Sequence, residues 1–178
     1  ALFSNTIGGG NTAVGYQALN ANLTGNDNFA LGTSALLANS SGSNNFALGT
    51  SALASNTGSS NTALGYQAGY TNTGQYSNQT GSNNVYLGYN AGPWTQNASF
   101  NNSTAIGAYA LVNASNSLVL GGTAFYAVNV GIGTATPSAA LDIQGGNRGG
   151  NSALIVNQTG VSTNDIFTAS SSGTTRFV

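Results

Sequence analysis

Hydrophobic positions in the first two thirds of the chain recur around a glycine that returns at a loose but real spacing. The anchor glycines are Gly15, Gly32, Gly49, Gly65, Gly88, Gly107 and Gly121, so successive anchors lie 17, 17, 16, 23, 19 and 14 residues apart. The aliphatic residues directly before them are Val14, Leu31, Leu48, Leu64, Leu87, Ile106 and Leu120. Alanine stands three positions after each anchor, and asparagine stands four positions before each of the first five. The repeating unit is therefore Asn-x-Ala-aliphatic-Gly-x-x-Ala-Leu, followed by a polar stretch.

This pattern predicts strands and turns rather than helices. Gly, Asn, Ser and Thr at this density disfavour a helix, and the apolar positions lack the spacing of a helical stripe. Each unit fits a short strand, a glycine bend, a second short strand and a polar turn. A unit of this length can form one coil of a β-solenoid, and stacked coils stabilise one another because a single coil cannot bury its apolar face. We therefore predict an all-β, repeat-built β-solenoid or β-roll over residues 1–126.

Stacking would give each position of the unit its own role. We expect the aliphatic residues before the anchors to form an inward spine, and the alanines to fit inside a thin coil. The anchor glycines would permit the bends that a Cβ blocks. The recurrent asparagines suit amide ladders between coils, or turn positions with positive φ.

After residue 126 the repeat pattern of the sequence ends. Residues 127–145 form a connector, and residues 146–178 hold three short strand-like pieces separated by turn-like glycines and serines. The last piece ends in apolar residues, and an unpaired apolar edge strand normally has a covering partner. We expect another copy of the chain to cover it. The predicted assembly strand consists of Thr174, Thr175, Arg176, Phe177 and Val178.

The composition excludes several functions. Charged residues make up 3% of the chain, against about 25% in average proteins. Because His and Cys are absent, a metal site or nucleophile built on them is impossible. The only cations, Arg148 and Arg176, are too few for a nucleic-acid surface. We expect no cofactor, no metal and no enzymatic activity, since Asp27, Asp142 and Asp165 are scattered along the chain.

No apolar run is long enough to insert in a membrane. With no initiator Met and no basic leader, the chain is expected to be a processed piece of a longer one.

Aromatic residues and glycosylation sequons supply the remaining candidate sites. Tyr16, Tyr66 and Tyr89 each follow an anchor glycine, which predicts a structural ladder, a subunit contact or a carbohydrate-binding row. A ligand or contact patch is predicted at Trp94, Tyr76 and Phe100, in and near the longest inserted linkers. Sugar would help to solvate an uncharged surface, either O-linked or at the Asn-x-Ser/Thr sites. These sites begin at Asn22, Asn39, Asn78, Asn97, Asn101, Asn102, Asn113 and Asn157.

Two stretches resemble known groups of proteins. The segments Thr62-Ala63-Leu64-Gly65-Tyr66-Gln67-Ala68 and Thr104-Ala105-Ile106-Gly107-Ala108-Tyr109-Ala110 resemble the head repeats of trimeric autotransporter adhesins, over about residues 5–124. That resemblance implies a left-handed parallel β-roll in a homotrimer. The segment Asn129-Val130-Gly131-Ile132-Gly133-Thr134, with Pro137, Ser138 and Leu141-Asp142-Ile143, is similar to parts of phage tail-fibre and bacterial surface-fibre proteins. It implies an extracellular, cell-surface or virion-fibre location.

These observations favour a structural subunit of an extracellular or cell-surface fibre that associates with itself through β-strand contacts. A homotrimer and a helical filament remain open, as does an adhesive role toward glycans or a surface receptor. The alternative is a carbohydrate-binding or other ligand-binding solenoid module, such as the receptor-binding segment of a phage tail fibre. An ice-binding array is disfavoured because the residues three before the anchors are mixed. They are Thr12, Phe29, Phe46, Thr62, Val85, Thr104 and Leu118.

Overall fold

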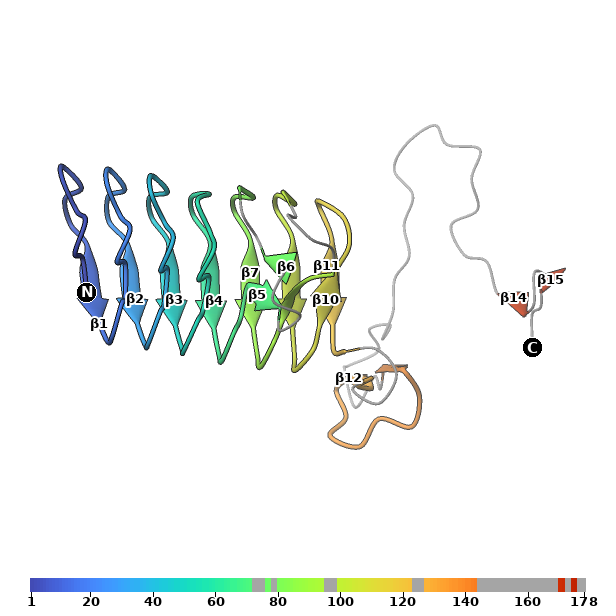
Figure 1. The fold of residues 1–178 in the computed structure, drawn as a ribbon. Helices are drawn as coiled ribbons and strands as arrows, with labels where there is room; N and C mark the ends of the chain where they lie inside the picture. Colours follow the sequence, from blue (N-terminus) through green and yellow to red (C-terminus); the bar gives the residue numbers. More distant parts are fainter. Residues whose placement is uncertain are drawn as a thin grey trace, which may run out of the picture. The chain divides into compact units, whose positions relative to one another are not determined.

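The computed structural model describes residues 1–71, 76–77, 80–94, 99–122, 127–143, 170–171 and 174–175. The chain divides into two compact units, Ala1–Val128 and Asn129–Val178. The first unit is a parallel β-solenoid, and all regular elements of the described residues are strands, as the repeat predicts (Figure 1).

One strand from each coil joins a seven-stranded parallel sheet. In order, the strands are β1 (Thr12–Val14), β2 (Phe29–Leu31), β3 (Phe46–Leu48), β4 (Thr62–Leu64), β7 (Val85–Leu87), β9 (Thr104–Ile106) and β11 (Leu118–Leu120). Equivalent positions of the repeat pair with one another, for example Ala13 with Ala30 and Ala30 with Ala47. The alignment on the anchor glycines is therefore the register of the sheet.

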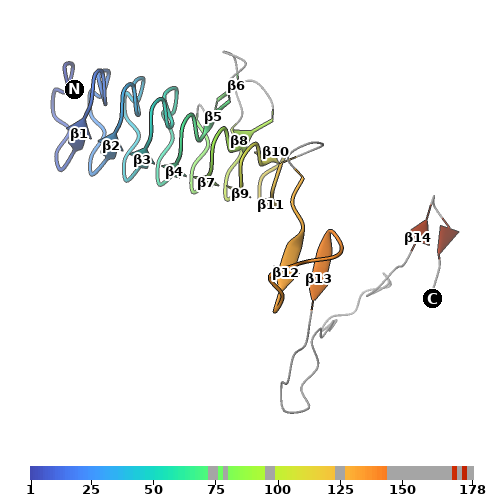
Figure 2. The same ribbon diagram turned by 90° about the horizontal axis from the view of Figure 1, so that it is seen from below.

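Shorter strands form away from this sheet in the last three coils (Figure 2). Strands β5 (Tyr70–Thr71) and β6 (Tyr76–Ser77) pair antiparallel, while β8 (Gly92–Pro93) and β10 (Leu111–Val112) pair in parallel. The described strands of these coils lie outside the seven-stranded sheet, which continues without interruption. In the second unit, β12 (Val130–Ile132) and β13 (Leu141–Ile143) pair in parallel. There β14 (Ser170–Ser171) and β15 (Thr174–Thr175) pair antiparallel.

The interior of the solenoid is built mainly from alanine, as predicted. The middle residue of each sheet strand points inward, and the fully buried ones are Ala30, Ala47, Ala63, Tyr86 and Ala105. The alanines after the bends face them and are also fully buried: Ala18, Ala35, Ala52, Ala68, Ala91 and Ala110. Leucines that follow three of these alanines, Leu19, Leu36 and Leu53, complete the core.

The predicted inward spine is wrong. Val14, Leu31, Leu64, Ile106 and Leu120 are 57%, 39%, 44%, 39% and 43% exposed, and Leu48 and Leu87 are half-buried. Successive side chains of a strand point to opposite faces, so an inward alanine places the next residue outward. The narrow interior admits alanine at this position, and the larger aliphatic side chain lies on the outer face.

The anchor glycines do form the bends. Gly15, Gly32, Gly49, Gly65, Gly88 and Gly107 have φ between 114° and 135°, and Gly121 has φ 79°. Residues that have a Cβ rarely adopt such φ angles. Each bend also lies directly against the bend of the next coil, so a Cβ on Gly32 would come 2.6 Å from the carbonyl group of Gly49.

Substituting one bend glycine is therefore expected to destabilise the solenoid. Gly32→Ala should lower the free energy of unfolding by about 3 kcal/mol, because it adds backbone strain and a clash between coils. Chemical denaturation followed by circular dichroism measures this. Gly9→Ala is the matched control, since the nearest atom to its new Cβ lies 3.8 Å away. Equal effects of the two substitutions would contradict this role of the bends.

Buried asparagines link the coils, which confirms the amide-ladder prediction. In the main ladder, the Oδ1 of each asparagine but the last accepts the backbone N–H and the side-chain Nδ2 of the asparagine in the following coil, and the last Oδ1 accepts the backbone N–H and hydroxyl of Ser103. Its members are Asn11, Asn28, Asn45, Asn61 and Asn84, with donor–acceptor distances of 3.0–3.2 Å. A second ladder runs through Asn5, Asn22 and Asn39. Positive φ occurs instead at the residue just before several of the main-ladder positions, for example Asp27, Asn44 and Asn83.

Candidate functional site

The strongest candidate site is the outward side of the seven-stranded sheet, which we call the outer face. Two rows of side chains cover it, one on each side of the inward row. One row is Val14, Leu31, Leu48, Leu64, Leu87, Ile106 and Leu120, and the other is Thr12, Phe29, Phe46, Thr62, Val85, Thr104 and Leu118. At a spacing of about 4.8 Å between strands, the outer face runs for about 29 Å. Every strand places at least one apolar side chain on it, three threonines interrupt the second row, and neither row contains a charged residue.

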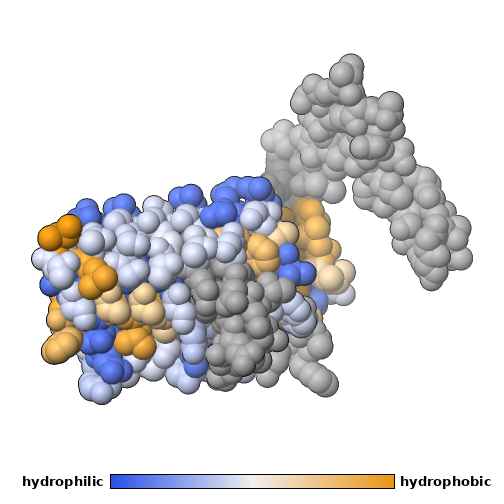
Figure 3. Space-filling model, turned by 45° about the horizontal axis from the view of Figure 1, so that its top comes forward, coloured by the Kyte–Doolittle hydropathy of each residue, from blue (hydrophilic) through white to orange (hydrophobic). Residues whose placement is uncertain are grey.

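The turns contrast with the outer face because they are polar. Figure 3 shows hydrophilic side chains along the edge formed by the turns, and apolar ones gathered at the end formed by the first coils. Many of the polar groups serve the fold. In the turns, the Ser43 hydroxyl accepts the backbone N–H of Asn26, and the Ser59 hydroxyl accepts that of Ser43. Neutral hydroxyls and amides thus solvate and connect the coils where other proteins use charges.

The aromatic column predicted at the bends forms in part. The rings of Tyr66 and Tyr89 stack with centroids 5.3 Å apart and planes 12° apart, and Tyr109 meets Tyr89 edge-on at 5.3 Å. The pKa of Tyr89 is raised above its usual value, chiefly because its hydroxyl forms a hydrogen bond with Tyr109. Tyr16 lies apart from this column, because Thr33 and Thr50 occupy the same position in the coils between. Stacked rings cover each other's faces, so the Tyr66–Tyr89 pair offers mainly ring edges to a ligand.

The predicted patch at Trp94, Tyr76 and Phe100 is only partly described. The side chain of Trp94 is 52% exposed directly after β8, and its backbone N–H donates to the carbonyl oxygen of Val112. Phe100 is half-buried and packs against the core, so it contributes to folding. The side chain of Tyr76 lies outside the described residues. Among the three, Trp94 is the residue that the described part of the chain presents to solvent.

Two of the predicted glycosylation sites are wrong. Asn22 and Asn39 are fully buried, and their Nδ2 atoms donate within the second asparagine ladder and to Gly25 and Gly42. A glycan cannot be attached there in the folded chain. Asn101, Asn102 and Asn113 are exposed. Asn78, Asn97 and Asn157 lie outside the described residues.

The predicted assembly strand falls mostly outside the described residues. Thr174 and Thr175 form β15, which pairs antiparallel with β14. Arg176, Phe177 and Val178 are not described, so the expectation that another copy covers this strand stays a prediction.

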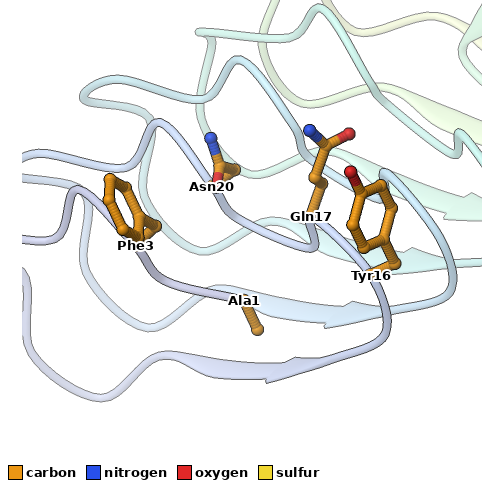
Figure 4. A pocket seen from close by; sticks show the side chains of 5 residues that line it. All are labelled: Ala1, Phe3, Tyr16, Gln17 and Asn20. Carbon is orange, nitrogen blue, oxygen red and sulfur yellow. The ribbon is translucent and has the colours of Figure 1, made fainter.

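A shallow pocket of about 420 Å³ lies against the first coil (Figure 4). It is lined by Ala1, Phe3, Tyr16, Gln17 and Asn20. The aromatic rings of Phe3 and Tyr16 are both highly exposed, and Gln17 and Asn20 add amide groups. This combination of rings and amides can bind a neutral sugar or a small polar molecule.

The acidic residues form no shared site in the described part of the chain. Asp27 lies in a turn with φ 54°, and Asp142 accepts hydrogen bonds from the backbone N–H and hydroxyl of Ser138. Asp165 lies outside the described residues. Across those that are described, no three His, Cys, Asp or Glu residues gather as metal ligands would. The same part of the chain has no helix of the length and apolarity that a membrane span requires.

No protein-family model, curated protein or solved structure matches the chain. Sequence reasoning placed the apolar column correctly along the chain but pointed it to the wrong side of the sheet. Adjacent strand positions face opposite sides, so the alanine beside each aliphatic residue was the alternative candidate for the interior.

Proposed function

We propose that this chain is a non-enzymatic structural subunit of an extracellular or cell-surface fibre, and that copies associate through the outer face. The observation that carries the proposal is the exposure of large apolar side chains on six of the seven strands of the sheet, all but β7.

A parallel sheet is normally covered on both faces. Here the inward face packs on the alanine core, while the outer face has no cover from the described residues. Contiguous apolar surface of this extent is uncommon on monomers and marks an interaction site. Burying it would contribute about 25 cal/mol for each Å² removed from water. Because the outer face carries no charge, two copies can approach each other without repulsion.

A second copy is the partner that fits this surface best. The outer face is a straight strip with one repeat per strand, and another copy offers a strip with the same spacing and length. The resemblance to adhesin head repeats favours a homotrimer, in which three strips meet. A helical filament would arise if the contact surfaces did not close on themselves. The similarity of residues 129–143 to fibre proteins supports a fibre as the setting, and the lack of His and Cys in the composition supports a non-enzymatic role.

Self-association through the outer face can be tested by measuring the mass of the assembled particles. The chain should sediment as a discrete oligomer or as a filament. The double variant Leu31→Gln, Leu64→Gln should have a dissociation constant at least about 100-fold higher. Each substitution removes about 2 kcal/mol of the free energy gained by burying apolar surface in the contact. Analytical ultracentrifugation over a range of concentrations measures this, and negative-stain imaging separates trimers from filaments.

Leu23→Gln is the matched control, since Leu23 is exposed to a similar degree but lies outside the outer face. It should leave assembly unchanged. Circular dichroism must show that the double variant keeps its β-structure; if it does not, the milder Leu64→Ala should still shift the dissociation constant. A folded chain that stays monomeric at all concentrations would refute the proposal.

The pocket at the first coil favours a second candidate, a carbohydrate-binding module. Its rings are unstacked, unlike those of Tyr66 and Tyr89, so their faces are open to a sugar. Binding of neutral oligosaccharides that is lost in Tyr16→Ala and retained in the double variant of the outer face would support this function.

A further inference from the structure

A second feature of the molecule is the column formed by Tyr66, Tyr89 and Tyr109, which we call the tyrosine column. It lies at the bends and is separate from the outer face. Tyr66 and Tyr89 occupy the same position in consecutive coils, and each side chain is 44% exposed. Their rings are nearly parallel, with planes 12° apart and centroids 5.3 Å apart. The phenol groups of both residues are thus held beside each other and within reach of a reagent in solvent.

The backbone fixes this arrangement. Gly88 N–H donates to the carbonyl oxygen of Leu64, and Asn90 N–H donates to that of Tyr66, at 2.8 and 3.0 Å. These bonds flank the two tyrosines and lock their coils in register. Neighbouring strands lie about 4.8 Å apart. A biphenyl joined ortho to both hydroxyls spans a similar distance between its points of attachment, so the rings can be linked without separating the coils.

The composition directs oxidation toward these rings. Cysteine and methionine, the side chains that react first with peroxides in most proteins, are absent, and so is histidine. The same absence leaves the chain without disulfides. Tyrosine and the single tryptophan remain as the side chains that a one-electron oxidant attacks.

We propose that Tyr66 and Tyr89 form a modification site, at which a peroxidase-type oxidant joins two neighbouring coils through a dityrosine bond. Each phenol loses one electron and its hydroxyl proton, which leaves a radical with spin density on the carbon ortho to oxygen. The two ortho carbons form one C–C bond. The hydrogen atom on each then moves to the phenolic oxygen, which restores both aromatic rings. In total the protein loses two hydrogen atoms, and one hydrogen peroxide is reduced to two water molecules.

The linkage would close the coil between Tyr66 and Tyr89, which is the longest of the solenoid and carries β5 and β6. A covalent cross-link stabilises the folded state mainly by restricting the unfolded chain, and more so for longer loops. The bond would therefore act in this cysteine-free chain as a disulfide acts in other extracellular proteins.

The test treats the full chain with a haem peroxidase and hydrogen peroxide. Dityrosine fluorescence should develop, and peptide mapping should find the peptides of Tyr66 and Tyr89 joined with the loss of two hydrogen atoms. The product should run as a single chain on a denaturing gel, and its melting temperature should rise by several degrees. Tyr89→Phe and Tyr66→Phe, each checked for intact circular dichroism, should both abolish this product.

Tyr16→Phe is the matched control, because Thr33 and Thr50 separate Tyr16 from the column, and it should leave the yield unchanged. Three results would overturn the proposal. They are the absence of dityrosine in the folded chain, a yield that persists in both column variants, and linkage mainly between different copies. The last result would instead place the tyrosine column at a contact between subunits.

Discussion

Asn45→Ala is expected to lower the free energy of unfolding by about 4 kcal/mol, a large fraction of the stability of a typical domain. Asn45 is almost fully buried in the main asparagine ladder. Its Nδ2 donates to Asn28 Oδ1 and to the carbonyl oxygen of Gly58, at 3.0 and 2.9 Å. Its Oδ1 accepts the backbone N–H and the Nδ2 of Asn61, at 3.0 and 3.2 Å.

The size of the effect follows from what the substitution leaves behind. Alanine keeps the backbone N–H of Asn45 but takes away the acceptor of the Asn61 N–H. A buried donor without a partner costs about 1–3 kcal/mol, and several groups lose a partner at once. The loss also spreads, because each coil of a solenoid is stabilised by its neighbours.

Denaturant unfolding of the full chain measures the change. Asn113→Ala makes the same chemical change at an exposed position and should alter the free energy of unfolding by less than about 0.5 kcal/mol. If both substitutions had the same small effect, the ladder would not be a major source of stability.

The sequence alone was sufficient to predict the register of the solenoid. In a parallel stack, each position pairs with its equivalent in the next coil, so glycine must meet glycine and asparagine must meet asparagine. Irregular coil lengths did not obscure this, because the extra residues after Gly65 and Gly88 leave the sheet strands in register. An alignment on the chemically demanding positions is therefore an alignment in space.

The direction of the side chains was harder to predict. Each sheet strand is only three residues long, and a strand this short shows no alternation that separates inside from outside. Hydrophobicity alone favours leucine over alanine for the interior. The volume inside the coil decides otherwise, and that volume depends on how closely the opposite wall approaches, which no single unit of the repeat reveals.

The buried sequons at Asn22 and Asn39 show a related limit. A serine or threonine two residues after an asparagine is a local pattern, whereas burial depends on the neighbouring coils. A clue was present in the spacing, because Asn5, Asn22 and Asn39 each precede a glycine by three residues. In each case the Nδ2 atom of the asparagine donates to the carbonyl oxygen of that glycine. Recurrence at one position of the repeat indicates a structural role for an asparagine, and sequons that share it are poor candidates for glycosylation.

The inward row of the sheet permits an equally strong prediction. Ala47→Asp should unfold the solenoid or leave it without a cooperative transition. Ala47 is fully buried between Ala30 and Ala63, its partners on the two adjacent strands, and alanines of the opposite wall fill the rest of the interior. An aspartate there would need space that the thin coil lacks. It would also bury a charge that the described residues of the core cannot pair, at a cost of several kcal/mol.

Thr50→Asp places the same group at an exposed position of the same coil and should leave the circular dichroism and melting temperature nearly unchanged. Thermal unfolding of the two variants thus reports which side of the sheet faces inward: a folded Ala47→Asp chain with an unaltered melting temperature would reverse the assignment. The aliphatic row would then have to be the buried one, and the outer face could no longer serve as the surface through which copies associate.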